Sequence, residues 1–161
     1  MVRQRAITLI ETLVYLAVFG VMFTVVIAFM LSVSESNRRS LVQNEVERSV
    51  LFLFNHMEDT FNRASAINAG TSVFDNNNGV LHLTAGTDDY IYRLDSQRIE
   101  FSEEGVDNFI SSGELRVTQL RFEPVELSDG SLVGIRVVAT YTSDKFPDVV
   151  REVESAFLLD F

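Results

Sequence analysis

The chain has 161 residues, a formal net charge of −10 and no cysteine. This length suits one domain with or without a membrane anchor, and the missing thiols exclude disulfides, thiol catalysis and cysteine-ligated metal sites. A strongly acidic surface repels phosphate backbones, so we expect no direct binding of nucleic acid.

A long apolar run lies near the N-terminus, because residues 12–34 contain no charged side chain. About 20 apolar residues, at about 1.5 Å rise each, span a hydrocarbon core about 30 Å thick. Apolar residues occur on all sides of this helix, which favours lipid over a soluble core. The run therefore predicts a transmembrane helix.

Three kinds of processing fit this run. The first is an uncleaved signal-anchor, and the second is a secretory signal peptide cut after the small-x-small sequence "SVS" at residues 32–34. The run is longer than the usual apolar region of such signal peptides. The third is a cut before the run, between Ala6 and Ile7.

Glu11 lies close to the start of the apolar run. A lone carboxylate inside lipid is unfavourable by several kcal/mol, so it must be paired, neutral or near the membrane edge. One alternative is that Glu11 reaches back to the interface on its N-terminal side. The other is that a positive group pairs with it.

The sequence "AITLIE", from Ala6 to Glu11, follows a short basic leader and precedes the apolar run. This combination resembles the N-terminus of type IV prepilins and type II secretion pseudopilins. In that family a prepilin peptidase cuts after a glycine or, less often, an alanine. The new N-terminal residue is N-methylated, and a glutamate lies fifth after the cut. The resemblance implies that Ala6 and Ile7 form the processing site, in place of the usual Gly and Phe, and that Glu11 acts in assembly.

Cleavage at this site would create a positive α-amino group on Ile7, about 6 Å from Glu11 along the helix axis. A neighbouring subunit staggered by this distance would place its own Glu11 against the amine. Charge pairing inside lipid would then select one stagger, as an ordered filament requires. We therefore expect Glu11 to be needed for assembly.

The helical period continues beyond the apolar run, and no proline or glycine occurs between Val21 and Ala69. This predicts one helix from about Ile7 to about Ala66, the alternative being two helices with a kink near residues 32–36. An apolar stripe at steps of three and four consists of Val42, Val46, Val50, Phe54, Met57, Phe61 and Ala64.

The period then changes to that of strands, and five or six antiparallel strands are expected. The segment from Ser102 to Gly113 has no alternation and is expected to be a loop. Residues 75–79, "DNNNG", predict a turn rich in Asx side chains, because a calcium-binding EF-hand would need its glycine one position later. A hairpin is expected around a turn at Asp95–Gln97, with Tyr90, Tyr92 and Leu94 on the strand before the turn and Ile99 and Phe101 on the strand after it. The other expected strands are Val80–Thr84, Leu115–Val125, Gly134–Thr142 and Val149–Leu159, and the strand Leu115–Val125 is expected to contain a bulge.

The predicted fold class is α+β and, by the resemblance, pilin-like: a long N-terminal helix whose apolar stripe covers an antiparallel sheet. The expected divisions are a leader at 1–6, a transmembrane and assembly helix at 7–34, the amphipathic half of the same helix at 35–66, and a β-rich domain at 67–161. This layout is closer to a J-type minor pseudopilin than to a major pilin.

Catalytic and metal-binding motifs are absent from the sequence. His56 and His82 are the only histidines and have no metal-ligand spacing, and no phosphate-binding loop or G-x-S-x-G motif occurs. Asp144 and Asp148 could bracket a calcium ion, although such oxygen ligands pair often by chance. We expect no enzyme activity, no cofactor and no metal site.

The resemblance implies a minor pilin or pseudopilin that assembles into, or primes, a type IV pilus or a type II secretion pseudopilus. Its expected partners are the prepilin peptidase, other pilin subunits and the membrane. Its expected location is the cytoplasmic membrane, crossed once, with the C-terminal domain outside the cytoplasm and later in a periplasmic or cell-surface filament. Two alternatives are an anchored binding domain that never polymerises and a secreted enzyme.

Overall fold

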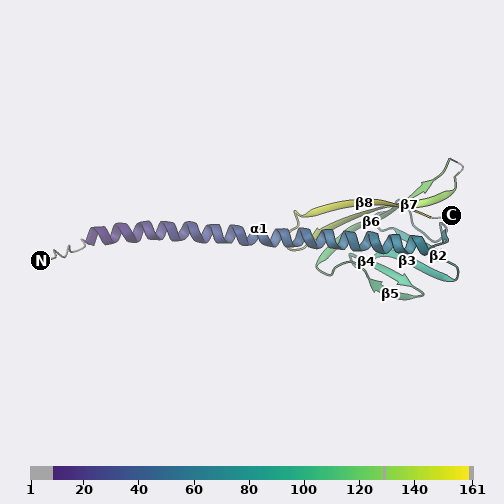
Figure 1. The fold of residues 1–161 in the computed structure, drawn as a ribbon, viewed down its shortest axis with the longest axis horizontal. Helices are drawn as coiled ribbons and strands as arrows, with labels where there is room; N and C mark the ends of the chain where they lie inside the picture. The colour runs from purple at the N-terminus through teal and green to yellow at the C-terminus, as the bar shows by residue number, and fades with distance from the viewer. Residues whose placement is uncertain (1–8, 129, 160–161) are drawn as a thin grey trace. The chain divides into compact units, whose positions relative to one another are not determined.

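The computed structural model describes residues 9–128 and 130–159 and has an α+β architecture (Figure 1). The chain divides into two units, residues 1–40 and residues 41–161. The elements are α1 (Leu9–Arg63), β1 (Ala66–Ile67), β2 (Val80–Ala85), β3 (Asp88–Asp95), β4 (Arg98–Glu103), β5 (Val106–Phe109), β6 (Leu115–Glu126), β7 (Leu132–Ser143) and β8 (Val150–Leu158).

α1 is one helix without a break at residues 32–36, so the prediction of a single helix is confirmed and the two-helix alternative is wrong. Its described part begins at Leu9, and Ile7 lies outside the described residues. The helix ends at Arg63 rather than near Ala66. The reason is that Ala66 and Ile67 pair with Thr84 and Leu83 as strand β1.

In the first unit, the apolar side chains of α1 are all exposed. The large ones between Leu9 and Val33 keep between 41% and 80% of their surface accessible. By length and composition this helix can cross a membrane, and none of its most apolar 18-residue window is buried within the protein. These features are compatible with a membrane anchor.

The second unit contains two antiparallel sheets where the sequence predicted one. Five strands pair in the order β1-β2-β3-β4-β5, and three pair in the order β6-β7-β8. The C-terminal part of α1 runs alongside both sheets (Figure 1). The helix therefore covers two apolar faces rather than one.

The segment from Ser102 to Gly113 was expected to be a loop, and this expectation is wrong. β4 extends to Glu103, and β5 pairs with it after a two-residue turn at Glu104-Gly105. All four residues of β5 are exposed. A strand that buries neither face has no reason to alternate polar and apolar residues, so its sequence carries no period-two signal.

Other features of the strands agree with their sequence. The turn after β3 consists of Ser96 and Gln97, both with positive φ, which is the backbone of a type I′ hairpin. The predicted bulge in β6 occurs as a register shift between Val117 and Gln119. On β7, the predicted inward side chains are fully buried: Ile135, Val137, Ala139 and Tyr141.

The loop before β2 joins the two sheets through backbone hydrogen bonds to β6. The Asp75 N–H donates to the Phe122 carbonyl (2.9 Å), and the Gly79 N–H donates to the Leu120 carbonyl (2.8 Å). Within the loop the Asn78 N–H donates to the Asn76 side chain, as in an Asx turn, which confirms the predicted turn.

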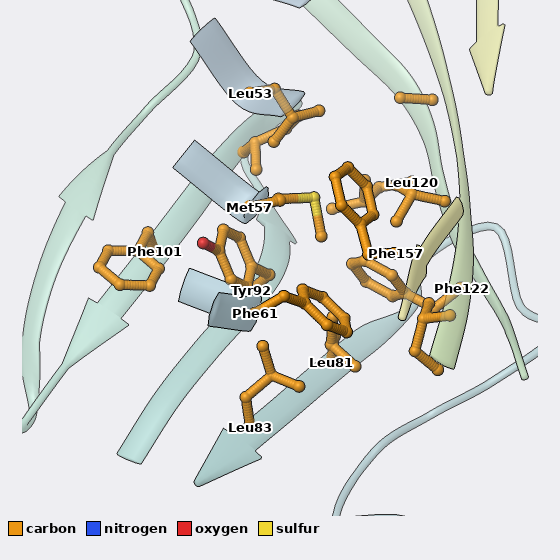
Figure 2. Close-up of a cluster of buried hydrophobic side chains, with 14 of the residues drawn as sticks. Leu53, Met57, Phe61, Leu81, Leu83, Tyr92, Phe101, Leu120, Phe122 and Phe157 are labelled. Carbon is orange, nitrogen blue, oxygen red and sulfur yellow. The ribbon is translucent and has the colours of Figure 1, made fainter. Parts of the chain in front are cut away.

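The core of the second unit lies between the two sheets and α1 (Figure 2). Four residues of the predicted stripe are buried in it: Val46, Met57 and Phe61 on α1, and Ala64 directly after the helix. Leu53 is also buried, although the predicted stripe omitted it. The buried face of α1 is wider than one row because the helix contacts both sheets.

Removing residues 1–33 should leave a soluble, folded domain. The fragment loses the exposed apolar run and keeps every described buried side chain, since the first of these along the chain is Val46. Far-ultraviolet circular dichroism and a cooperative thermal transition would show that it folds. Aggregation of the fragment under all conditions would mean that the buried face of α1 does not hold the domain together alone.

Candidate functional site

Glu11 lies in the first turn of the described part of α1, and its side chain is exposed. A carboxylate near a helix N-terminus interacts favourably with the positive end of the helix dipole. The two other residues predicted to act with it, Ala6 and Ile7, lie outside the described residues.

The hydroxyl of Tyr15 donates a hydrogen bond to Oε1 of Glu11 at 3.4 Å. Side chains on a helix lean toward its N-terminus, so a tyrosine four residues after a glutamate can lay its ring over the carboxylate. The sequence analysis missed this partner. The signal was present, since Tyr15 is the aromatic residue one helical turn after Glu11.

The polar hydroxyls deeper in the apolar run bond to the backbone of their own helix. Thr24 donates to the carbonyl of Gly20 at 2.9 Å, and Thr12 donates to the carbonyl of Leu9 at 3.0 Å. Such bonds satisfy a hydroxyl inside lipid without a second helix. These threonines are therefore compatible with a lipid-embedded segment.

Comparisons of the chain with protein-family models, with curated proteins and with solved structures find no match.

His82 contacts a hydroxyl on one side and a carboxylate on the other. Its Nδ1 lies 2.6 Å from Oγ1 of Thr71, and its Nε2 lies 3.1 Å from a carboxylate oxygen of Asp89. This order of groups resembles a hydrolase relay, and the sequence analysis did not find it. Nε2 forms no hydrogen bond with Asp89, because the geometry there does not meet the criteria for one.

The neighbouring contacts give His82 a structural role. Its backbone N–H donates to Oγ of Ser72, and its carbonyl accepts from the N–H of Asn68. The side-chain and backbone contacts together hold residues 68–72 against β2. We therefore assign this cluster to the packing of the loop rather than to a reaction.

Two of the carboxylates considered for calcium are engaged with arginines. Asp144 pairs with Nε of Arg116, and Asp75, in the Asx-rich turn, pairs with Arg121 at 3.3 Å. Within residues 9–128 and 130–159, no group of three or more His, Cys, Asp or Glu side chains is placed to hold a metal ion.

Two surface grooves flank α1 in the second unit. The larger, about 350 Å³, lies between the Glu45–Phe52 stretch of α1 and residues 109–112, with Phe52 and Phe109 exposed at its walls. The smaller, about 260 Å³, lies between the Glu58–Asn62 stretch and the C-terminal half of β8. Both are shallow surface features and hold no cluster of catalytic groups.

Proposed function

We propose that this chain is a pilin-like subunit, a minor pilin or pseudopilin, that inserts into the cytoplasmic membrane and assembles through its N-terminal helix. The observation that supports it best is the composition of α1. Its exposed apolar part carries a single carboxylate, Glu11, in its first described turn, and the same helix continues into the core of an antiparallel β domain.

In the proposed mechanism, a prepilin peptidase cuts between Ala6 and Ile7. The new α-amino group of Ile7 then pairs with Glu11 of a neighbouring subunit. In lipid this pair is favourable only when both groups meet, because each charge alone is poorly solvated. Pairing therefore selects the one stagger between helices that brings them together.

The exposed surface of the apolar run supports the other part of the proposal. A helix that is apolar all round has no buried partner in its own chain and requires either lipid or other apolar helices. A membrane before assembly and the packed helices of a filament after it supply both. The partners are accordingly the prepilin peptidase, sister subunits and the membrane, and the β domain lies outside the cytoplasm.

An anchored binding domain that never polymerises would use the same helix. Glu11 is the feature that favours assembly, because a simple anchor does not require a charge pair at this position. The Tyr15 hydroxyl provides one hydrogen bond but no charge. In the proposed mechanism, the positive partner of Glu11 is the processed N-terminus of a neighbouring subunit.

N-terminal sequencing and mass spectrometry of the protein extracted from membranes would test the proposal. We expect the mature chain to begin at Ile7 and to be N-methylated. A chain that begins at Met1 would support the anchored binding domain instead. A start near Glu35 would show that the apolar run is a secretory signal peptide and would overturn both membrane proposals.

A further inference from the structure

A buried polar cluster joins α1 to the five-stranded sheet around the hydroxyl of Tyr92 on β3. This oxygen lies 2.7 Å from Nδ1 of His56 and 2.7 Å from Oγ1 of Thr60, both on α1. The Thr60 hydroxyl also donates to the carbonyl of His56 at 2.8 Å. Thr60 and Tyr92 are fully buried, so the cluster lies within the packed interface of helix and sheet.

One arrangement of protons gives a hydrogen to each of these three short contacts. Thr60 has one hydrogen, which goes to the carbonyl of His56, so its oxygen must accept from Tyr92. The Tyr92 oxygen must then accept from Nδ1–H of His56. Neutral His56 therefore carries its proton on Nδ1, and Nε2 is the atom that can take up a second proton.

His56 is half-buried, and aromatic side chains contact the buried part of its ring. The ring lies edge-on to Phe101 with 4.4 Å between centroids, and it also contacts Phe52 and Tyr92. Burial lowers the pKa of His56, and Arg63 lowers it further. Two carboxylates oppose this shift and do not cancel it.

The charged and titratable groups that face His56 come from three elements. Arg63 and Asp59 lie on α1, Glu103 lies at the end of β4, and Tyr92 lies on β3. Burial raises the pKa of Tyr92, so its hydroxyl stays protonated and neutral at every pH that a cell or its medium reaches. His56 is therefore the member of the hydrogen-bonded cluster that can change charge between pH 5 and 7.

We propose that His56 is an acid-sensitive latch between α1 and the β3–β4 part of the sheet. When Nε2 takes up a proton, the ring carries a charge into an aromatic environment, and the packed state loses stability relative to a state in which the helix has loosened. The latch lies within the second unit and does not depend on whether the chain polymerises. If the domain lies outside the cytoplasm, the protonation of His56 depends directly on the pH of the medium.

The direction of the effect follows from proton uptake. Above pH 6.5 the ring is neutral in both states, and stability does not depend on it. Below pH 6.5 the loosened state binds the proton first, because the pKa in the packed state is lower. The equilibrium then shifts toward loosening by up to about tenfold per pH unit, until the packed state is also protonated.

Hydrogen-exchange mass spectrometry on the full chain in detergent micelles, at pH about 7 and about 5.5, would test the latch. After correction for intrinsic exchange rates, we expect protection of residues 52–60 and of β3 to fall in acid, by at most about tenfold. His56→Asn keeps a donor near the Nδ1 position and cannot take a charge, so it should abolish this fall. His82→Asn, the matched control at the other histidine, should keep it.

Three results would overturn the proposal: an unchanged protection in the unsubstituted chain, an equal fall in His56→Asn, or a loss of the fall in His82→Asn. If His56→Asn does not fold, the pKa of His56 can be measured instead, by nuclear magnetic resonance of the full chain with labelled histidine, and this pKa also tests the proposal. With only two histidines present, His82→Asn assigns the signals. A pKa of His56 at or above 6.5 in the folded protein would rule out the latch.

Discussion

Replacing Glu11 by alanine should leave membrane insertion intact and reduce assembly into filaments by at least about tenfold. Insertion depends on the apolar run, which the substitution makes still more apolar. Assembly, in the proposed mechanism, depends on a charge pair, and removing one partner of a buried pair destabilises it by about 3–5 kcal/mol. Since about 1.4 kcal/mol corresponds to a factor of ten, even part of this loss is sufficient.

The measurement compares two fractions in the cells that produce the protein: subunits that resist alkaline extraction from membranes, and subunits recovered in sheared or sedimented filaments. Glu35→Ala removes a carboxylate from the same helix outside the apolar run and should change neither fraction. Normal incorporation of Glu11→Ala into filaments would show that the carboxylate has no part in assembly. Loss of both fractions would point instead to a failure of insertion.

Gly134→Ala should be the most damaging small substitution in the β domain. Gly134 is buried on β7 opposite Leu158 of β8. A Cβ atom there would overlap the carbonyl oxygen of Phe157 and lie 2.7 Å from Cδ2 of Leu158. Because the carbonyl belongs to a paired strand, β8 must move away, and we expect a loss of about 3 kcal/mol of stability.

Thermal unfolding of the full chain in detergent would register this loss as a fall in Tm on the order of 10 °C. Gly70→Ala is the matched control, since a Cβ there meets only the Asn68 side chain at an ordinary 3.6 Å. Both substitutions add one methyl group and remove the same backbone freedom. Equal melting temperatures for the two variants would show that β8 can shift without loss of packing.

The elements with strong periodicity could be predicted from the sequence. The long helix follows from the absence of proline and glycine between Val21 and Ala69, and the inward faces of β3, β4, β6 and β7 follow from alternation. The bulge in β6 was visible because its apolar residues change from odd to even positions. On β3 and β7 one buried face imposed a period of two on the sequence.

The division into two sheets could not be predicted in this way. Alternation shows that a strand has one buried face, but it does not show which strands pair with one another. Here β5 is an edge strand without a buried face, and the loop at residues 73–79 connects the two sheets through backbone hydrogen bonds to β6. Hydrogen bonds between backbone groups place almost no requirement on the side chains, so the sequence does not show which segments pair in this way.

At the candidate site, only contacts between residues close together in the sequence could be predicted. Glu11 was found from its position in an apolar run, and its partner Tyr15 is only one turn away. The cluster of His56, Thr60 and Tyr92 joins residues 36 positions apart, and nothing in the sequence places β3 beside that turn of α1. The contact of His56 with the sheet was therefore not predicted.

The bulge in β6 has a consequence for how the chain can vary in length. Thr118 is the extra residue: Val117 pairs with Tyr141 and Gln119 pairs with Thr140, the adjacent residue of β7. Thr118 is also exposed, and no core side chain depends on it. A chain that lacked this one residue would keep every other partner along the two strands and would gain a regular alternation. The middle of β6 is thus a place where related chains can differ by a single insertion or deletion without a change in the core.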